Sequence, residues 1–441
     1  MNKQFNIILV VLMVMCSKIE LTAQQNPTPS PKQSKSVLIL NGIAHIGNGE
    51  KIENSAIGFK DGKLTLVADA RVIRIDMSAY DTIIYADGSH IYPGFIATNS
   101  TLGLLELDLV RQTNDESETG TFKPSIRSAI SYNTDSEIIP TVRSNGVLMG
   151  QITPRGGVIS GTSSVMQFDA WNWEDALIRE DDGVHLNWSG VYHRHYDKGK
   201  ISIEKVKTYD QQLREIQSFF RDAKAYCSAG KQTLIDLRFA ALCDVLSGKK
   251  ILYVHASDAK AMTEAINFKV EFSIPKMVII GGYDAYLIAD QLVSHNIPIM
   301  LERIHSLPRF NEDDVDLPYK LPKLLYDAGI KFCIQNEGDM ERMGARNLPF
   351  HAGTAVAYGL PYEEAVRALT LAPAQILGID ETCGSLESGK DATLFISSGD
   401  ALDMKSNAVT AAFIQGRLID LSSKQTELYH KYKKKYDEQK K

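Results

Sequence analysis

The chain has 441 residues, of which 44% are hydrophobic and 23% charged, and its formal net charge is −6. This length accommodates one large α/β domain plus a smaller module, and the composition is that of a globular protein. A net negative charge implies no basic surface overall, so we expect no nucleic-acid-binding role. The one basic cluster, residues 431–441, is best interpreted as the solvated end of a helix.

The first 23 residues have the pattern of a secretory signal peptide. Lys3 supplies the positive charge, residues 7–15 the apolar core, and Ala23 the cleavage position. A lipidated Cys16 is the alternative, but the residue before it is not small. We therefore expect an exported protein, periplasmic or secreted, with a disordered Pro/Ser/Gln-rich linker over residues 24–35. After removal of the signal, no stretch is apolar for long enough to span a bilayer.

Cysteines remain at four positions after the signal: Cys227, Cys243, Cys333 and Cys383. Export permits disulfides, and no pair has the Cys-x-x-Cys spacing of a metal or redox site. A bridge between Cys227 and Cys243 is compatible with this pattern. Cys333 lies in an apolar strand and is expected to be a buried thiol.

Short strands separated by turns fill residues 36–92. The Asp61-Gly62 pair between two apolar runs is a strong signal for a hairpin. From residue 93 onward, apolar strands instead alternate with helices, and such strand–helix units favour parallel strands. The expected strands are 146–153, 251–256, 277–282, 298–301 and 331–335, and the expected helices are 203–228, 234–245, 259–268, 285–294 and 363–374. The change of pattern near residue 93 indicates two domains.

Residues 91–103 read Ile-Tyr-Pro-Gly-Phe-Ile-Ala-Thr-Asn-Ser-Thr-Leu-Gly, an apolar run through a Pro-Gly turn into a short strand. This stretch resembles the first barrel strand of the amidohydrolase superfamily. There, Pro-Gly-Phe/Leu-Ile-Asp is followed by a His-x-His pair. Residues 363–374 resemble the segment that closes such barrels, and residues 383–396 resemble the family's Gly-x-Leu-x-x-Gly-x-x-Ala-Asp-Leu segment. The Gly-rich loop 154–162 resembles one in imidazolonepropionase-like, metal-dependent members.

The resemblance implies an α/β fold, a TIM-type (β/α)8 barrel with a small β-sandwich formed by both chain ends. It also implies a hydrolase that acts on carbon–nitrogen bonds other than peptide bonds. The expected domains are a signal peptide 1–23, a linker 24–35, a composite sandwich 36–92 plus 383–421, a barrel 93–382, and a charged tail 422–441.

Active members of the family hold one or two divalent ions at the C-terminal ends of the barrel strands. Asn99 and Thr101 stand where the first strand carries its two His residues. His255 matches the His of the fifth strand and is the only retained family ligand, whereas Gly281 stands where the sixth strand has His. This divergent member therefore lacks most of the ligands of the family.

Glu337 is the best match to the acidic residue that follows the eighth strand, with Asn336 or Asp339 as alternatives under a short slip in register. A catalytic zinc site usually needs about three protein ligands, so we do not expect the standard binuclear site. Because βα loops converge at a barrel mouth, other polar residues are further candidates for the pocket. They are Glu302, Arg303, His305 and His351.

Two interpretations stay open. In the first, an exported hydrolase uses His255 as ligand of a single divalent metal such as zinc and Glu337 as catalytic residue. In the second, a non-catalytic relative binds a small ligand, forms a homo-oligomer, or pairs with an active homologue. The charged insertion 105–145 fits either a solvated excursion or a lid. The local pair His193 and His195 lies in an irregular stretch expected to fold over the mouth as a loop.

Overall fold

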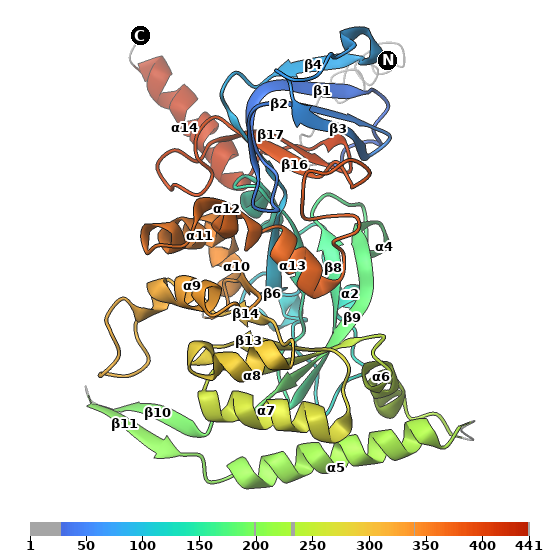
Figure 1. The fold of residues 1–441 in the computed structure, drawn as a ribbon, viewed down its shortest axis with the longest axis vertical. Helices are drawn as coiled ribbons and strands as arrows, with labels where there is room; N and C mark the ends of the chain where they lie inside the picture. Colours follow the sequence, from blue (N-terminus) through green and yellow to red (C-terminus); the bar gives the residue numbers. More distant parts are fainter. Residues whose placement is uncertain (1–27, 198–199, 231–233, 339, 440–441) are drawn as a thin grey trace, which may run out of the picture.

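Two eight-stranded sheets and a separate two-stranded hairpin make up the strands of this computed structural model. The structure describes residues 28–197, 200–230, 234–338 and 340–439. The predicted signal peptide, residues 1–23, lies outside this part of the chain. Figure 1 shows the sheet with β1 to β4, β16 and β17 at the top and the other sheet, with its helices, below it.

The first sheet combines strands from the two ends of the chain. Its order is β18-β17-β16-β5-β1-β2-β3, with β4 paired to β1. The chain ends meet where β16 pairs antiparallel with β5, and Asp61-Gly62 forms the predicted turn between β2 and β3. The bounds are β1 Val37–His45, β2 Lys51–Lys60, β3 Lys63–Asp69, β4 Thr82–Tyr85, β5 His90–Pro93, β16 Leu394–Ser397, β17 Val409–Ile414 and β18 Arg417–Leu418. This pairing defines a single sheet, and the two-sheet sandwich stays a prediction.

The second sheet is a nearly closed barrel with the order β6-β7-β8-β9-β12-β13-β14-β15. Residues 368–369 help to close the seam, because Ile96 N–H donates to Leu369 O at 2.9 Å and Ile334 N–H to Ala368 O at 3.1 Å. The bounds are β6 Phe95–Ser100, β7 Val147–Ile152, β8 Ile159–Gln167, β9 Leu177–Asn187, β12 Ile251–Ala256, β13 Met277–Gly281, β14 Ile299–Leu301 and β15 Phe332–Ile334. The fold is therefore α/β and consistent with the expected TIM-type barrel.

One barrel strand departs from the expected parallel arrangement. Strand β8 runs antiparallel to both β7 and β9. The Gly-rich loop joins β7 to β8 without a helix, and the single turn α4 (Trp173–Ala176) joins β8 to β9. Connections this short can join only antiparallel neighbours, whereas parallel neighbours need a long crossover. The sequence did not predict a strand over residues 159–167, and this missed strand is antiparallel to both of its neighbours.

Helices cover the outside of the barrel and its ends. They are α2 Ser128–Ser131, α3 Ile139–Arg143, α5 Tyr209–Ser228, α6 Leu237–Leu246, α7 Ala259–Phe272, α8 Ala289–Ser294, α9 Leu317–Asp327, α10 Glu341–Gly344, α11 Leu348–Ala357, α12 Tyr362–Arg367, α13 Leu371–Leu377 and α14 Lys424–Gln439, with 3-10 turns η1 Met77–Ala79, η2 Arg111–Thr113, η3 Ala285–Ile288 and η4 Ala345–Asn347. Two expected helices differ from this. The segment 203–228 begins as a strand, and 363–374 is broken at Thr370, whose φ of −127° and ψ of −88° are not helical.

Side chains alternate between the two faces of the barrel strands, as the strand period of two requires. Leu252 and Val254 of β12 belong to the main core under the helices. Tyr253, between them, instead joins Ile96 and Met149 in a second cluster inside the barrel. This alternation also sets which side of β12 His255 occupies, one residue before the strand ends.

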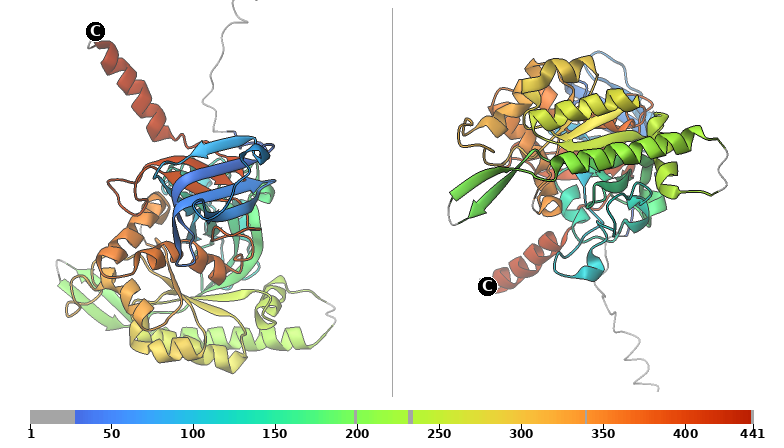
Figure 2. Two further views of the ribbon diagram at one scale, coloured as in Figure 1. Left: turned by 45° about the horizontal axis from the view of Figure 1, so that its top comes forward. Right: turned by 90° about the horizontal axis from the view of Figure 1, so that it is seen from below.

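The His193 and His195 pair lies on a regular strand, so the prediction of a loop there is wrong. Strand β10 (Tyr192–Asp197) pairs antiparallel with β11 (Lys200–Lys205). Figures 1 and 2 show this hairpin extending outward beside α5.

A disulfide joins Cys227 of α5 to Cys243 of α6, with 5.5 Å between their Cα atoms. Cys333 and Cys383 are free thiols, and both are buried. None of the helices in the described ranges is long and apolar enough to cross a membrane.

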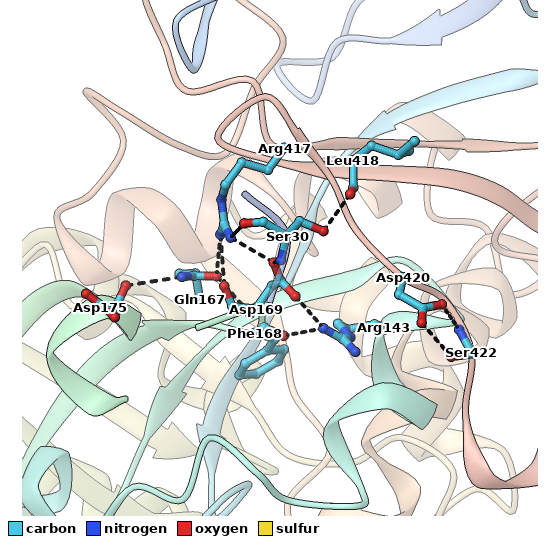
Figure 3. Close-up of polar contacts among 10 residues, drawn as sticks. All are labelled: Ser30, Arg143, Gln167, Phe168, Asp169, Asp175, Arg417, Leu418, Asp420 and Ser422. Carbon is cyan, nitrogen blue, oxygen red and sulfur yellow. Dashed lines mark hydrogen bonds and ion pairs between the residues drawn. The ribbon is translucent and has the colours of Figure 1, made fainter. Parts of the chain in front are cut away.

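A buried ion cluster, the Asp169 cluster, ties both ends of the chain to the barrel (Figure 3). Asp169 is 4% exposed and accepts hydrogen bonds from Arg143 at 2.9 Å and Arg417 at 2.8 Å. Its other contact is the backbone N–H of Ser30, at 3.0 Å. Ser30 belongs to the predicted linker, so the cluster holds this part of it against strand β8 and the C-terminal hairpin.

Candidate functional site at the barrel mouth

A cavity of about 450 Å³ lies at the C-terminal ends of strands β12 to β15. Of the predicted site residues, His255, Gly281, Glu302, Arg303 and Glu337 line it. Ser257, Asp258 and Arg309 line it too, and sequence reasoning did not single them out. A hollow of about 760 Å³ at the opposite, N-terminal ends of these strands contains none of the predicted residues. The mouth is where TIM-barrel sites are found.

His255 and Glu337 meet at this mouth. Nδ1 of His255 is 3.6 Å from Oε1 of Glu337, and Nε2 of Gln335 donates to Oε2 of Glu337 at 3.1 Å. Burial alone would raise the pKa of Glu337. Hydrogen bonding and attraction to His255, with the charge of Arg155 and the bond from Gln335, instead lower that pKa to about 2. Glu337 is therefore a carboxylate at neutral pH.

A second His, which sequence reasoning missed, lies directly behind His255. Nδ1 of His185 is 3.0 Å from Nε2 of His255, so both ring nitrogens of His255 face a partner. Burial, followed by the charges of His255 and Arg155, lowers the pKa of His185 well below its usual value. The sequence signal for His185 is the short run Val184-His185-Leu186, which is similar to Val254-His255-Ala256. It was not interpreted as a strand because charged residues precede it in β9.

The polar contacts continue from His185 into the barrel. Nε2 of His185 is 2.9 Å from Oγ of Ser163, and that hydroxyl donates to Asp182 at 2.7 Å. Tyr253 O–H and Gln151 Nε2 also donate to Asp182, at 2.5 and 2.8 Å. Burial raises the pKa of Asp182, although these hydrogen bonds oppose the rise. This chain of contacts fixes the orientation of both imidazoles from below.

Asn99 and Thr101 are buried and already hydrogen-bonded. Asn99 has a left-handed φ of 51°. Arg155 donates to Asn99 Oδ1 at 2.8 Å and to Asn99 O at 2.7 Å. Thr101 donates from N and Oγ1 to Glu341 Oε2 at 3.1 and 2.8 Å. Strand β6 is irregular between Ala97 and Ser100 and ends at Ser100, so the rule that i and i+2 share a face does not apply here.

Gly281 leaves little room for a side chain. Its φ is +113°, and a Cβ atom there would lie 2.4 Å from Ser257 Oγ. Ser257 in turn donates to Glu302 Oε2 at 2.8 Å, and Arg309 donates to the same oxygen at 2.7 Å. Burial raises the pKa of Glu302, and Arg309 counteracts the rise.

His305, Asn336 and His351 do not line the cavity. The rings of His305 and His351 stack with centroids 4.1 Å apart, and Nε2 of His351 is 3.0 Å from Oδ1 of Asn336. Burial lowers the pKa of His351 to about 3, with the charges of His305 and Arg303 adding to the effect. Asp339 lies outside the described residues.

The charged insertion 105–145 contacts both the Gly-rich loop, where Arg155 N–H donates to Glu116 O at 2.6 Å, and helix α10. Asp108 pairs with Arg342 of α10 at 2.7 Å, while Leu109 beside it is 99% exposed. A role as a lid stays a prediction. In the described part of the chain, no three His, Cys, Asp or Glu side chains are grouped as a metal ion would require.

Comparison with known proteins points to one superfamily. The model of the amidohydrolase family matches residues 320–419. The amidohydrolase tasK of Hapsidospora irregularis is 24% identical over 170 residues, which is 38% of this chain and 17% of that protein. The imidazolonepropionase of Flavobacterium psychrophilum is 27% identical over 112 residues, which is 24% of this chain and 27% of that protein. The matched segments thus cover only a minor part of each relative.

Solved structures match most of the chain. An amidohydrolase from Thermotoga maritima has a TM-score of 0.74 and 24% identity, covering 87% of this chain and 99% of that one. A Xaa-Pro dipeptidase has a TM-score of 0.54 and 13% identity, covering 87% of this chain and 100% of that one. At such identities the likeness shows the fold, and it agrees with the resemblance found in the sequence.

Proposed function

Because the chain belongs to the amidohydrolase superfamily, we propose that it is a protein of this hydrolase class that binds a small molecule at its barrel mouth. We further propose that the molecule carries a carbon–nitrogen bond other than a peptide bond. The observation that carries the proposal is the cavity of about 450 Å³ lined by His255 and Glu337. Ligands of barrel proteins bind at this end of the strands.

The side chains at the mouth are arranged to orient a polar ligand. Glu337, held as a carboxylate by His255 and Gln335, can accept hydrogen bonds from N–H groups of an amide or amine. Glu302 is held by Ser257 and Arg309, so its position is fixed before a ligand arrives. Such preorganised groups reduce the entropy cost of binding.

The arrangement favours binding without the standard binuclear metal site of the family. The oxygen atoms of Asn99 are already bound by Arg155, and Thr101 Oγ1 donates to Glu341. Nε2 of His255 is 3.0 Å from His185 and Nδ1 is 3.6 Å from the Glu337 carboxylate, so a metal at either nitrogen would have to displace one of these contacts. These residues do not fit a pair of zinc ions, which prefer imidazole, thiolate or carboxylate ligands. In this candidate the chain is a non-catalytic binder that acts alone, as a homo-oligomer, or with an active homologue.

Hydrolysis is the second candidate, and the close approach of His255 to Glu337 favours it. Here Glu337 would be the catalytic residue and His255 would hold a single divalent metal such as zinc. This candidate requires the contact between His255 and His185 or that between His255 and Glu337 to open, because a ligating imidazole needs a free nitrogen lone pair.

A panel of lactams, hydantoins and N-acyl amino acids tests the proposal. We expect at least one class to raise the Tm of the mature protein, because a ligand that binds only the folded state stabilises it. Glu337→Gln should abolish the shift, whereas Glu312→Gln, at an exposed position, should keep it. Release of an amine or acid would favour the hydrolase candidate. A panel that shifts neither the wild type nor the Glu312 variant contradicts the proposal.

We also propose that the protein is exported, to the periplasm or outside the cell. The disulfide between Cys227 and Cys243 supports this, because such bonds persist in oxidising compartments. Mass spectrometry of the protein purified from its natural host should find a mature chain that begins at Gln24 and a disulfide between Cys227 and Cys243. Cys227→Ser with Cys243→Ser should lower the free energy of unfolding by about 3 kcal/mol, the entropy effect of a loop of this length. An intact N-terminus with both thiols reduced contradicts export.

A further inference from the structure

Arg155 is hydrogen-bonded to Asn99, the first of the two expected ligand positions on the first barrel strand. It lies in the Gly-rich loop between β7 and β8, and both ends of its guanidinium bind one residue. Nη1 donates to Asn99 Oδ1 at 2.8 Å, and Nη2 donates to Asn99 O at 2.7 Å. A planar guanidinium fork is suited to two parallel acceptors of this kind.

The two hydrogen bonds shown for the Arg155 guanidinium go to neutral oxygen atoms, which do not cancel its charge. In the described ranges, no Asp or Glu oxygen lies within ion-pair distance of this guanidinium, whereas other arginines such as Arg143 and Arg309 have such a partner. The positive charge of Arg155 is therefore left to act on its surroundings. It acts on two carboxylates: it adds to the effect of His255 in lowering the pKa of Glu337, and it opposes the rise that burial causes in the pKa of Glu116.

In the family that this chain resembles, the first barrel strand presents ligand atoms to a metal cation, and here the same strand presents oxygen atoms to the Arg155 guanidinium. Asn99 takes the place of the first His of the family pair, and two of its oxygen atoms point at a positive charge. The backbone of Asn99 adopts a left-handed φ of 51°, which brings both oxygens to one side. Asn99 itself is fixed from behind by Gln151 and Gln335.

We propose that the guanidinium of Arg155 is a built-in cation that holds the place of a metal ion at the end of the first barrel strand. It positions Asn99 and balances the Glu337 carboxylate, so the mouth keeps its shape without a bound divalent ion. The inference rests on the proposed function only in taking the barrel mouth as the binding site. A simple structural tie would fix Asn99 equally well but would be indifferent to the charge of Glu337.

Cation replacement tests this role in the full mature chain. Arg155→Ala should lower the Tm, and millimolar methylguanidinium or Co²⁺ should restore at least half of the loss, because either cation can enter the vacated space. Arg179→Ala is the matched control, since Arg179 also donates to two backbone carbonyls, those of Leu377 and Gly378. Its Tm should fall without recovery in Co²⁺. The Tm of the wild type should not respond to Co²⁺ or to a chelator.

Two results would overturn the inference. One is about one Co²⁺ ion per wild-type chain, measured by absorption and metal analysis and lost in His255→Ala. The other is a Tm of Arg155→Ala that neither cation raises. If Arg155→Ala does not fold, Arg155→Lys replaces it. That variant keeps the charge but not the fork, so its Tm should fall less than that of the neutral variant Arg155→Met and should respond to neither added cation, because the Lys ammonium repels both; equal falls in the two variants would overturn the inference. Ligand-induced Tm shifts in the wild type report on the proposed function separately, so the two can fail independently.

Discussion

Arginine side chains organise two buried regions of this protein in different ways. At the Asp169 cluster, Arg143 and Arg417 form ion pairs with a buried carboxylate. At the barrel mouth, Arg155 meets the amide and backbone oxygens of Asn99. The first region brings opposite charges into direct contact, whereas the second satisfies the guanidinium with neutral acceptors.

The difference separates a structural cluster from one suited to function. A buried charge is tolerated only when it is paired and hydrogen-bonded, and removing one partner leaves the other uncompensated. The Asp169 cluster therefore contributes mainly to stability, because its charges act on each other. The charge of Arg155 acts on Glu337 and on whatever enters the cavity. We expect variants of the first region to unfold the protein more readily and variants of the second to change what it binds.

Asp169→Asn should produce the largest effect. The variant keeps the shape of the side chain but removes the charge between Arg143 and Arg417, so the buried guanidinium of Arg143 and the partly exposed one of Arg417 both lose an ion pair. We expect the free energy of unfolding to fall by about 3–5 kcal/mol, measured by urea denaturation. Ligand-induced Tm shifts should persist in the folded fraction.

Asp175→Asn is the control for this variant. Asp175 lies near the cluster in Figure 3, but only its backbone oxygen takes part, as the acceptor of Gln167 at 3.1 Å. Its side chain is exposed, and a surface substitution of this kind changes stability by less than about 0.5 kcal/mol. Equal losses in the two variants would contradict the distinction between the Asp169 cluster and its surroundings.

The sequence predicted the barrel, and it identified the residues that line the cavity better than those behind it. His255 and Glu337 follow apolar strands directly, so strand ends alone brought them to one mouth. His185 and Arg155 were missed because β8 runs antiparallel and β9 opens with charged residues. The burial of Asn99 and Thr101 was also not predicted, because it depends on an irregularity of strand β6 and on partners more than 50 residues away in the sequence.

His351 offers an intermediate test, because it is a buried neutral group beside Arg303 and His305. Its pKa is about 3 in the folded protein, against about 6.5 when unfolded. As pH falls from about 6.5 toward 3, the unfolded state gains this proton first. Stability is therefore complete above pH 6.5 and is lost on acidification, by up to about 1.4 kcal/mol per pH unit.

The measurement is urea denaturation between pH 7 and 4. His351→Gln should flatten the decline in this window, because Gln does not titrate. His430→Gln, in the exposed helix α14, should leave the decline as it is in the wild type. A wild-type profile that both variants reproduce would show that protonation of His351 does not couple to unfolding.

The smallest effect on stability should come from Glu337→Gln, and it is the most informative about the mouth. The Glu337 side chain is 35% exposed, so solvent screens its interactions, and we expect a loss of about 0.5–1 kcal/mol. A double-mutant cycle then combines Glu337→Gln with Arg155→Ala. The two single variants together should lose more free energy of unfolding than the double variant loses, which corresponds to a coupling of about 0.5–1 kcal/mol. The analogous cycle with Arg179→Ala should give no coupling, because that arginine does not face the carboxylate. Additive losses in both cycles would mean that Arg155 interacts with Asn99 but not with Glu337. Arg155 would then have a structural role only, like the arginines of the Asp169 cluster.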